Sequence, residues 1–204
     1  MVAVAGSIRR VSAVGSSGSG KSTVARRLAD ILGVPYVELD AIHWRPGWVE
    51  EEPDVFVDRV REATRADAWV IDGNYQSKVG TLVWESAELV VWINPPRWRV
   101  MVQVTLRTLR RAARREELWN GNREGWGGLR LWSSSDSVIR WAWDSYAPQI
   151  ERYEAAMVDP RYRHLRFVRL RSRRDVERFL EEVGRSGLHG GRLPGEGQVG
   201  DAAG

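Results

Sequence analysis

The sequence has no cysteine, almost no lysine and no long hydrophobic run, and each absence excludes a class of protein. Without cysteine there is neither a disulfide scaffold nor a thiolate metal site, which fits a reducing cytoplasm. No apolar stretch approaches the length of a membrane span, and residues 1–10 lack the charged-then-apolar order of a secretion signal. We therefore expect a cytoplasmic protein that has no membrane partner.

Positive charge comes from arginine, because lysine occurs only at Lys21 and Lys78 while the formal net charge is +4. Arginine recognises phosphate through planar, bidentate hydrogen bonds, so the composition admits both a nucleotide enzyme and a nucleic-acid binder. With 204 residues, 43% of them apolar, the chain is long enough for one domain with a proper core. The composition predicts no particular oligomeric state.

Residues 15–23 match the phosphate-binding pattern G-x-x-x-x-G-K-[ST] between a predicted strand and a predicted helix, the context that the motif requires. Glycines let successive backbone N–H groups curl round a phosphate, and the start of the helix adds its positive end. Lys21 would place a cation on the β- and γ-phosphates, and Ser22 would offer a hydroxyl ligand to Mg²⁺. The predicted nucleotide-binding residues here are Gly15, Ser16, Gly18, Ser19, Gly20, Lys21, Ser22 and Thr23.

Hydrophobic patterns predict strands that alternate with helices. The expected strands cover residues 10–14, 36–40, 68–73, 89–94 and 165–170. The expected helices cover residues 22–32, 53–66, 80–87, 97–115, 136–157 and 172–183. Apolar strands in this order indicate an α/β fold of three layers, in which helices cover both faces of a parallel sheet and ligands bind beyond the carboxyl ends of the strands.

One domain, residues 10–184, accounts for nearly all of these elements. We expect residues 1–9 to be an N-terminal extension, and residues 185–204, which are rich in glycine and poor in apolar side chains, to be a disordered tail. A polar, glycine-rich segment at about 116–135 has the composition of a small lid or of a plain loop.

Two aspartates follow predicted strands. Asp72 ends a strand that reads as buried on both faces, and a carboxylate there can hold Mg²⁺ opposite Ser22. Asp40 ends another strand, where it can accept a proton from a substrate hydroxyl or orient that hydroxyl. The alternatives are a solvated turn for Asp72 and a cap for Asp40.

An aromatic loop follows Asp40 and is a candidate acceptor pocket, with stacking by indoles and anion binding by arginine. Its members are His43, Trp44, Arg45 and Trp48. Such a loop is also an ordinary cover for the edge of a sheet.

The predicted helix at residues 97–115 has two unlike sides. Its apolar side, on which an amphipathic helix packs, holds Val102, Leu106, Leu109 and Ala113. Its opposite side holds Arg107, Arg110, Arg111, Arg114 and Arg115. Arginines beside a mobile loop neutralise charge that develops during phosphoryl transfer, so we predict catalytic roles for Arg107 and Arg111. A solvated basic face, or a surface for nucleic acid, is the alternative.

The last predicted strand is followed by Arg171 and Arg173, whose guanidinium planes would suit stacking with an adenine ring. Basic residues at the end of a strand are also common on ordinary protein surfaces.

Five segments form a pattern of their own: residues 15–23, 39–48, 70–75 (V-I-D-G-N-Y), 94–97 and 170–173. Together they resemble the adenylate-kinase-related P-loop proteins of the "DNA topology modulation" family, over roughly residues 11–183. The resemblance implies a five-stranded parallel sheet in adenylate-kinase order, a small lid, and ATP-dependent phosphoryl transfer with Mg²⁺. Asn74 and Tyr75 stand where adenylate kinases have Phe-Pro-Arg after Asp-Gly, so the acceptor is left open, and we predict that Asn74 contacts it.

The sequence favours a P-loop kinase that transfers the γ-phosphate of ATP to a hydroxyl or phosphate of a small molecule. One alternative is a nucleotide-dependent regulator that binds nucleic acid, although no DNA-reading motif is present. Another is an NTPase switch without a small-molecule acceptor.

Overall fold

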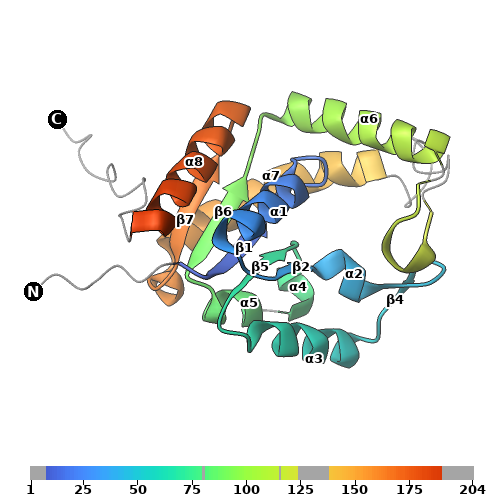
Figure 1. The fold of residues 1–204 in the computed structure, drawn as a ribbon. Helices are drawn as coiled ribbons and strands as arrows, with labels where there is room; N and C mark the ends of the chain where they lie inside the picture. Colours follow the sequence, from blue (N-terminus) through green and yellow to red (C-terminus); the bar gives the residue numbers. More distant parts are fainter. Residues whose placement is uncertain (1–7, 80, 115, 124–137, 190–204) are drawn as a thin grey trace, which may run out of the picture.

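Residues 8–79, 81–114, 116–123 and 138–189 are described in the computed structural model of the protein (Figure 1). At its centre lies one sheet of five parallel strands in the order β2-β5-β1-β6-β7. The strands are β1 (Arg10–Val14), β2 (Tyr36–Glu38), β5 (Trp69–Asp72), β6 (Leu89–Ile93) and β7 (Arg166–Leu170). The predicted parallel sheet and its adenylate-kinase-like order are confirmed.

Helices connect the strands and cover both faces of the sheet. They are α1 (Lys21–Leu32), α2 (Leu39–His43), α3 (Pro53–Thr64), α4 (Gln76–Val79), α5 (Leu82–Ser86), α6 (Arg97–Arg114), α7 (Val138–Val158) and α8 (Arg173–His189). A hairpin of β3 (Trp44–Arg45) and β4 (Val49–Glu50) follows α2, and the 3-10 turns η1 (Trp119–Gly121) and η3 (Pro160–Tyr162) follow α6 and α7. No helix within the described ranges is both long and apolar enough to cross a membrane.

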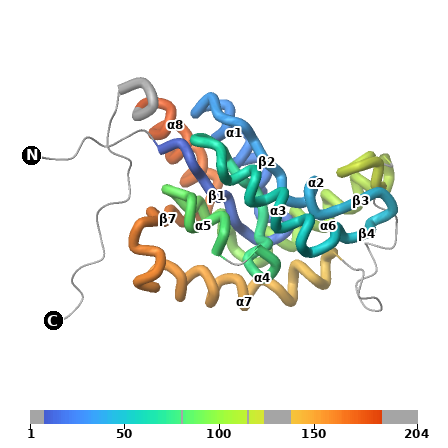
Figure 2. Tube along the Cα trace, turned by 90° about the horizontal axis from the view of Figure 1, so that it is seen from below, coloured from blue at the N-terminus to red at the C-terminus, as the bar shows by residue number. Residues whose placement is uncertain are grey.

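Two hydrophobic clusters hold the sheet between its helices. One joins the sheet to α1 and α8 and includes Leu28 and Phe179. The other joins the sheet to α3, α5 and α7 and includes Phe56, Trp84 and Tyr153. Figure 2 shows α1 and α8 on one side of β1 and α7 on the other. The predicted three-layer α/β/α fold is thus confirmed.

The second strand is shorter than the sequence predicts. β2 ends at Glu38 and α2 begins at Leu39, where we expected a strand through residue 40. Leu39 is buried and packs against Gly73, on which a Cβ would lie 2.8 Å from the Cβ of Leu39. This contact takes the chain off the sheet, so Asp40 lies in a short helix instead of at the end of a strand.

The side of α6 that packs is the reverse of the one that the sequence predicts. Val102, Leu106 and Leu109 are exposed, Leu106 by 60%. The buried side is formed by Val100, Val104, Thr108 and Ala112. A Cβ on Gly18 of the phosphate loop would lie 2.8 Å from the Cβ of Val104, which also packs on α7. Such close approach favours short side chains over leucine, which explains the reversal.

Other bounds differ from the predicted ones by a few residues, and α4 and the hairpin are not predicted at all. The last helix, expected at residues 172–183, runs to His189, so residues 185–189 of the predicted tail are helical. Residues 1–7 of the predicted extension, 124–135 of the predicted lid and 190–204 of the predicted tail lie outside the described residues.

Candidate active site

The phosphate loop, residues 15–20, leaves β1 and packs closely on two neighbours. Gly15 has φ 154° and Gly18 has φ 83°, a backbone region that side chains with a Cβ rarely adopt. A Cβ on Gly15 would come within 2.4 Å of the carbonyl oxygen of Ile93, and one on Gly18 would meet Val104. Glycine is therefore sterically favoured at both positions, of which only Gly15 is a fixed position of the sequence motif.

The loop turns into α1 through Gly20. The N–H of Ser19 donates to the carbonyl of Ser16 at 3.0 Å, which closes a turn, and Gly20, with φ 92°, is the N-cap of α1. The first N–H groups of α1 have no partner within their own helix and carry its positive end, so the loop and the helix form a cradle for an anion. Ser22 and Thr23 lie in this first turn.

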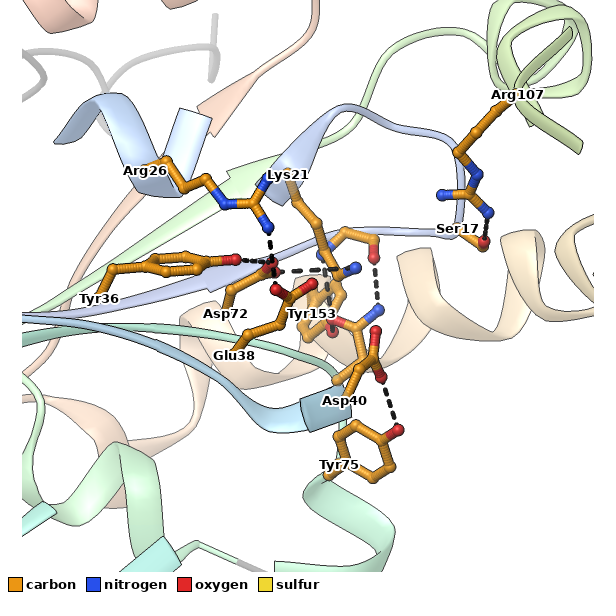
Figure 3. Close-up of polar contacts among 12 residues, drawn as sticks. Ser17, Lys21, Arg26, Tyr36, Glu38, Asp40, Asp72, Tyr75, Arg107 and Tyr153 are labelled. Carbon is orange, nitrogen blue, oxygen red and sulfur yellow. Dashed lines mark hydrogen bonds and ion pairs between the residues drawn. The ribbon is translucent and has the colours of Figure 1, made fainter. Parts of the chain in front are cut away.

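Lys21 faces a buried carboxylate across the cradle. Its Nζ lies 3.7 Å from Oδ1 of Asp72, whose side chain is 1% exposed (Figure 3). Oδ2 of Asp72 accepts a hydrogen bond of 3.0 Å from the hydroxyl of Tyr36. Burial and the charge of Asp72 raise the pKa of Tyr36, so this hydroxyl remains a donor. The two oxygens of Asp72 thus have separate partners.

Tyr36 is not among the residues that the sequence singles out. It begins β2, which pairs with β5, and this neighbour relation brings its hydroxyl to Asp72. Arg26 of α1 covers the ring at 5.1 Å from Cζ to the centroid and donates to Glu38 at 2.9 Å. Tyr36 could not be identified from the sequence alone, because its position beside Asp72 depends on the pairing of β2 with β5.

The surroundings of Asp72 fit Mg²⁺. Oδ1 is buried, accepts no hydrogen bond from a described residue, and has the Lys21 ammonium as its charged neighbour. Mg²⁺ is usually bound by one or two protein oxygens together with waters and phosphate oxygens. No group of three or more His, Asp or Glu able to hold a metal occurs among the described residues, so an ion here would take its remaining ligands from a nucleotide and water. Ser22 would supply the second protein oxygen.

The carboxylate of Asp40 is hydrogen-bonded to a tyrosine from a different segment of the chain. Its Oδ1 accepts a hydrogen bond of 2.6 Å from the hydroxyl of Tyr75 (Figure 3). Burial and the carboxylate of Asp40 raise the pKa of Tyr75, so the phenol keeps its proton. Asp40 comes from α2 and Tyr75 from the segment between β5 and α4, and the bond between them fixes the orientation of the carboxylate.

His43 lies in the interior and not on a surface open to an acceptor. The residue as a whole is 2% exposed. Its ring packs edge-on against Trp44 and Phe56, with centroids 4.8 and 5.0 Å away, and at 4.8 Å against Tyr75. His43, one of the residues predicted to bind the acceptor, therefore packs beneath the aromatic loop and supports it.

The polar edge of His43 meets an ion pair. Its Nε2 lies 3.1 Å from Nζ of Lys78 and 3.5 Å from Oε1 of Glu50, and Lys78 donates to Glu50 at 2.7 Å. Burial, and then the charge of Lys78, lower the pKa of His43. A neutral imidazole that accepts a hydrogen bond from Lys78 is the consistent arrangement.

The rest of the aromatic loop forms the hairpin β3–β4, and η1 is bound to it. The N–H of Trp48 donates to Oδ1 of Asn122 at 2.8 Å, and Nδ2 of Asn122 donates to the carbonyl of Arg45 at 2.9 Å. The rings of Trp48 and Trp119 meet edge to face, with centroids 6.2 Å apart. Trp44 is half-buried, while Arg45 and Trp48 are exposed.

A second asparagine strengthens this attachment. Nδ2 of Asn120 donates to the carbonyl of Ala41 at 3.1 Å and also to the carbonyl of Trp44. Asn120 has φ 55°, a left-handed conformation that asparagine tolerates better than most residues. The sequence predicts a small lid or a plain loop at about 116–135, and the structure attaches residues 119–122 of it to the hairpin.

Arg107 reaches the phosphate loop. Its Nη2 donates to Oγ of Ser17 at 2.8 Å (Figure 3). Arg111 follows one helical turn later and is half-buried, whereas Arg110 and Arg114 are exposed. The two arginines for which we predict catalytic roles are therefore half-buried, whereas the other two are exposed to solvent.

The two arginines predicted to contact adenine flank a helix cap. The carboxylate of Asp175 accepts from the N–H groups of Arg171 and Ser172 at 3.1 and 2.9 Å, and Oγ of Ser172 accepts from the N–H of Asp175 at 3.1 Å. This reciprocal pattern starts α8 and holds the backbone between β7 and α8. The side chains of Arg171 and Arg173 are exposed.

Asn74, predicted to contact the acceptor, faces the phosphate loop instead. Its Oδ1 accepts from the N–H of Gly15 and from the hydroxyl of Tyr153, each at 3.0 Å. Its Nδ2 donates to the carbonyl of Gly15. The side-chain amide of Asn74 is thus hydrogen-bonded to other parts of the protein.

The comparison with solved structures concerns the fold. A shikimate kinase from Acinetobacter baumannii, in complex with shikimate, superimposes with a TM-score of 0.50 at 17% identity, over 89% of this chain and 93% of that one. The chain has a P-loop NTPase fold. A gluconokinase from Sinorhizobium meliloti 1021 is 19% identical over 90% of this chain and 91% of that one, with a TM-score of 0.47. No protein-family model matches the sequence, and no curated protein matches it significantly.

Proposed function

We propose that the protein is a kinase that transfers the γ-phosphate of ATP to a hydroxyl or phosphate group of a small molecule. The observation that carries the proposal is the pairing of Lys21 with buried Asp72 at the mouth of the phosphate loop, with Nζ and Oδ1 3.7 Å apart. This pairing puts a cation and a metal-binding carboxylate beside an anion cradle, as phosphoryl transfer requires. The fold shared with a shikimate kinase agrees with it.

Each residue of the candidate site would have a separate role. The loop amides and Lys21 would bind the β- and γ-phosphates, and Ser22 and Asp72 would hold Mg²⁺, which neutralises phosphate charge when it is bound. Arg107, already at Ser17, would stabilise charge that develops on the transferred group. Arg111 would approach from the next turn of α6, while Arg171 and Arg173 would flank the base.

On the acceptor side, Asp40 is the group that would act on the substrate. When the acceptor is a hydroxyl, the oxygen of that hydroxyl attacks the γ-phosphorus of ATP, and the bond from the γ-phosphorus to the bridging oxygen of ADP breaks. The proton of the hydroxyl passes to Asp40. Tyr75 keeps the Asp40 carboxylate oriented for this transfer. Trp44, Arg45 and Trp48 would form the outer wall of the acceptor site.

The test is ATP consumption by the purified protein with pooled nucleosides, nucleotides, sugars and small hydroxy acids. One pool should give Mg²⁺-dependent ADP release that both Lys21→Ala and Asp40→Ala abolish. If ATP binds and no pool accelerates its loss, the kinase proposal fails and an NTPase switch takes its place.

A second candidate is a nucleotide-dependent protein that binds nucleic acid, as the resemblance to the "DNA topology modulation" family would suggest. It is supported by the exposed arginines Arg110 and Arg114 on α6. DNA affinity should then fall steeply with salt, with a shallower slope after Arg110→Ala. Absence of binding at low salt would remove this candidate.

A further inference from the structure

One side-chain amide holds both backbone groups of the first glycine in the phosphate loop. The N–H of Gly15 donates to Oδ1 of Asn74 at 3.0 Å, and Nδ2 of Asn74 donates to the carbonyl oxygen of Gly15. Paired bonds of this kind satisfy the backbone as a neighbouring strand would, and they fix the orientation of both peptide groups of Gly15.

Tyr153 of α7 holds the amide in turn. Its hydroxyl donates to Oδ1 of Asn74 at 3.0 Å. The ring is 1% exposed and lies against Trp84 and Trp92, with centroids 6.0 and 5.2 Å away. Burial raises the pKa of Tyr153, so the hydroxyl keeps the proton that it donates. The orientation of the amide is thus set by a side chain that is itself buried and packed against two indole rings.

The position of Asn74 joins the phosphate loop to the metal-binding carboxylate. Asn74 lies two residues after Asp72, beyond Gly73, whose φ of 154° and contact with Leu39 fix the turn. Gly15 is confined on its other side by Ile93 and by Oγ of Ser19. A displacement of Asn74 would therefore change both the conformation of the phosphate loop and the position of the loop relative to Asp72.

We propose that Asn74 is a positioning residue, which together with Tyr153 holds the phosphate loop in its nucleotide-binding conformation. The proposal rests on the nucleotide-binding part of the proposed function and involves no acceptor. Asn74 acts through Gly15, and Tyr153 acts through Asn74.

The experiment measures the dissociation constant of MgATP by calorimetry, with the full chain and no acceptor. Asn74→Ala removes the two bonds to Gly15 and should weaken binding about 10-fold. Tyr153→Phe removes one of the two donors to Oδ1 and should weaken binding about 3-fold. Lys21→Ala serves as the variant that does not bind.

The double variant separates positioning from general loss of structure. If Tyr153 acts through Asn74, Tyr153→Phe should have no further effect in the Asn74→Ala background, whereas independent effects would multiply. Tyr162→Phe is the matched control, because Tyr162 packs on Trp84 at 5.1 Å and its hydroxyl has no hydrogen-bond partner among the described residues. It should leave the MgATP affinity unchanged.

Unchanged MgATP affinity in Asn74→Ala overturns the proposal, and so does an equal loss from Tyr153→Phe in both backgrounds. If Asn74→Ala is unfolded by circular dichroism, the comparison of Tyr153→Phe with Tyr162→Phe decides: a loss confined to Tyr153→Phe supports the proposal, and no loss overturns it. If Lys21→Ala binds MgATP normally, nucleotide binding at this loop fails, which is a different result.

Discussion

Tyr36 donates a hydrogen bond of 3.0 Å to Oδ2 of Asp72, while Oδ1 of the same carboxylate faces Nζ of Lys21 at 3.7 Å. The carboxylate is therefore fixed on one side by a neutral donor and directed on the other side toward the phosphate loop. A group that orients a metal ligand from behind commonly contributes 10- to 100-fold to metal affinity.

Tyr36→Phe should raise the Mg²⁺ concentration needed for half-maximal nucleotide binding by roughly tenfold, because Asp72 loses the bond that orients it. Binding of ATP in the absence of Mg²⁺ should change little. Titration of Mg²⁺ at fixed ATP measures the effect, with Tyr162→Phe as the control. An equal loss with and without Mg²⁺ would show that Tyr36 supports the fold and not the ion.

Gly18→Ala should destabilise the protein by about 1–3 kcal/mol and weaken nucleotide binding, because the new Cβ would lie 2.8 Å from that of Val104 and φ is 83°. Gly33→Ala is the matched control, since φ is 63° and nothing lies within 4 Å of the added Cβ. It should cost about 1 kcal/mol through backbone strain alone. Chemical denaturation and calorimetry measure both quantities, and equal nucleotide affinities in the two variants would contradict the prediction.

Asn122→Ala should loosen the hairpin, because Asn122 is 3% exposed and its side chain bonds to both Trp48 and Arg45. We expect a loss of about 1–3 kcal/mol in local stability and faster hydrogen exchange at the amide of Trp48. Glu117→Gln is the control on the same segment, since its contact with Arg123 is an exposed ion pair of 3.4 Å. Equal exchange rates in the two variants would show that the bonds of Asn122 do not hold the hairpin.

His43 should make the protein less stable in mild acid. Its pKa is lowered from the ordinary 6.5 by burial and by Lys78, against the opposing charges of Glu50 and Asp40. Below pH 6.5 the unfolded chain therefore binds a proton that the folded chain does not, and the free energy of unfolding falls as the pH falls toward the folded pKa.

The variant His43→Gln should reduce the difference in unfolding free energy between pH 7.5 and about 5.5. The lowered pKa of Glu50 acts in the same direction, but only below its ordinary 4.5, so the two windows are distinguishable. Urea denaturation at several pH values provides the measurement. A pH dependence identical to that of the parent protein would mean that His43 protonates equally in both states.

The placement of Asp72 beside the phosphate loop and Lys21 could be predicted from short, local patterns: a glycine-rich turn, and an acid that ends an apolar run. The sheet was predictable because its buried strands are almost uniformly apolar. The packing side of α6 was not, since the helix presents leucines on one side, and the side with Val100 and Val104 is buried because it approaches Gly18 and α7.

Contacts across the sequence could not be read from single segments. Asn74 and Tyr153 are 79 residues apart, and Asn122 and Arg45 are 77 apart. The sequence Asp-Gly-Asn is the same whether the side-chain amide of the asparagine contacts a substrate or the protein backbone. Which of these it does depends on how α7 and the phosphate loop are placed, and that placement follows from the order of the strands.

The contact between Trp48 and Trp119 gives the molecule an intrinsic optical signal. Their rings lie 6.2 Å apart at 82°, close enough for the electronic transitions of the two indoles to couple. Coupled indoles produce a pair of far-ultraviolet circular dichroism bands of opposite sign that separated indoles lack. The separation of η1 from the hairpin can thus be followed in unlabelled protein, by the difference between the spectra of the parent and Trp119→Phe.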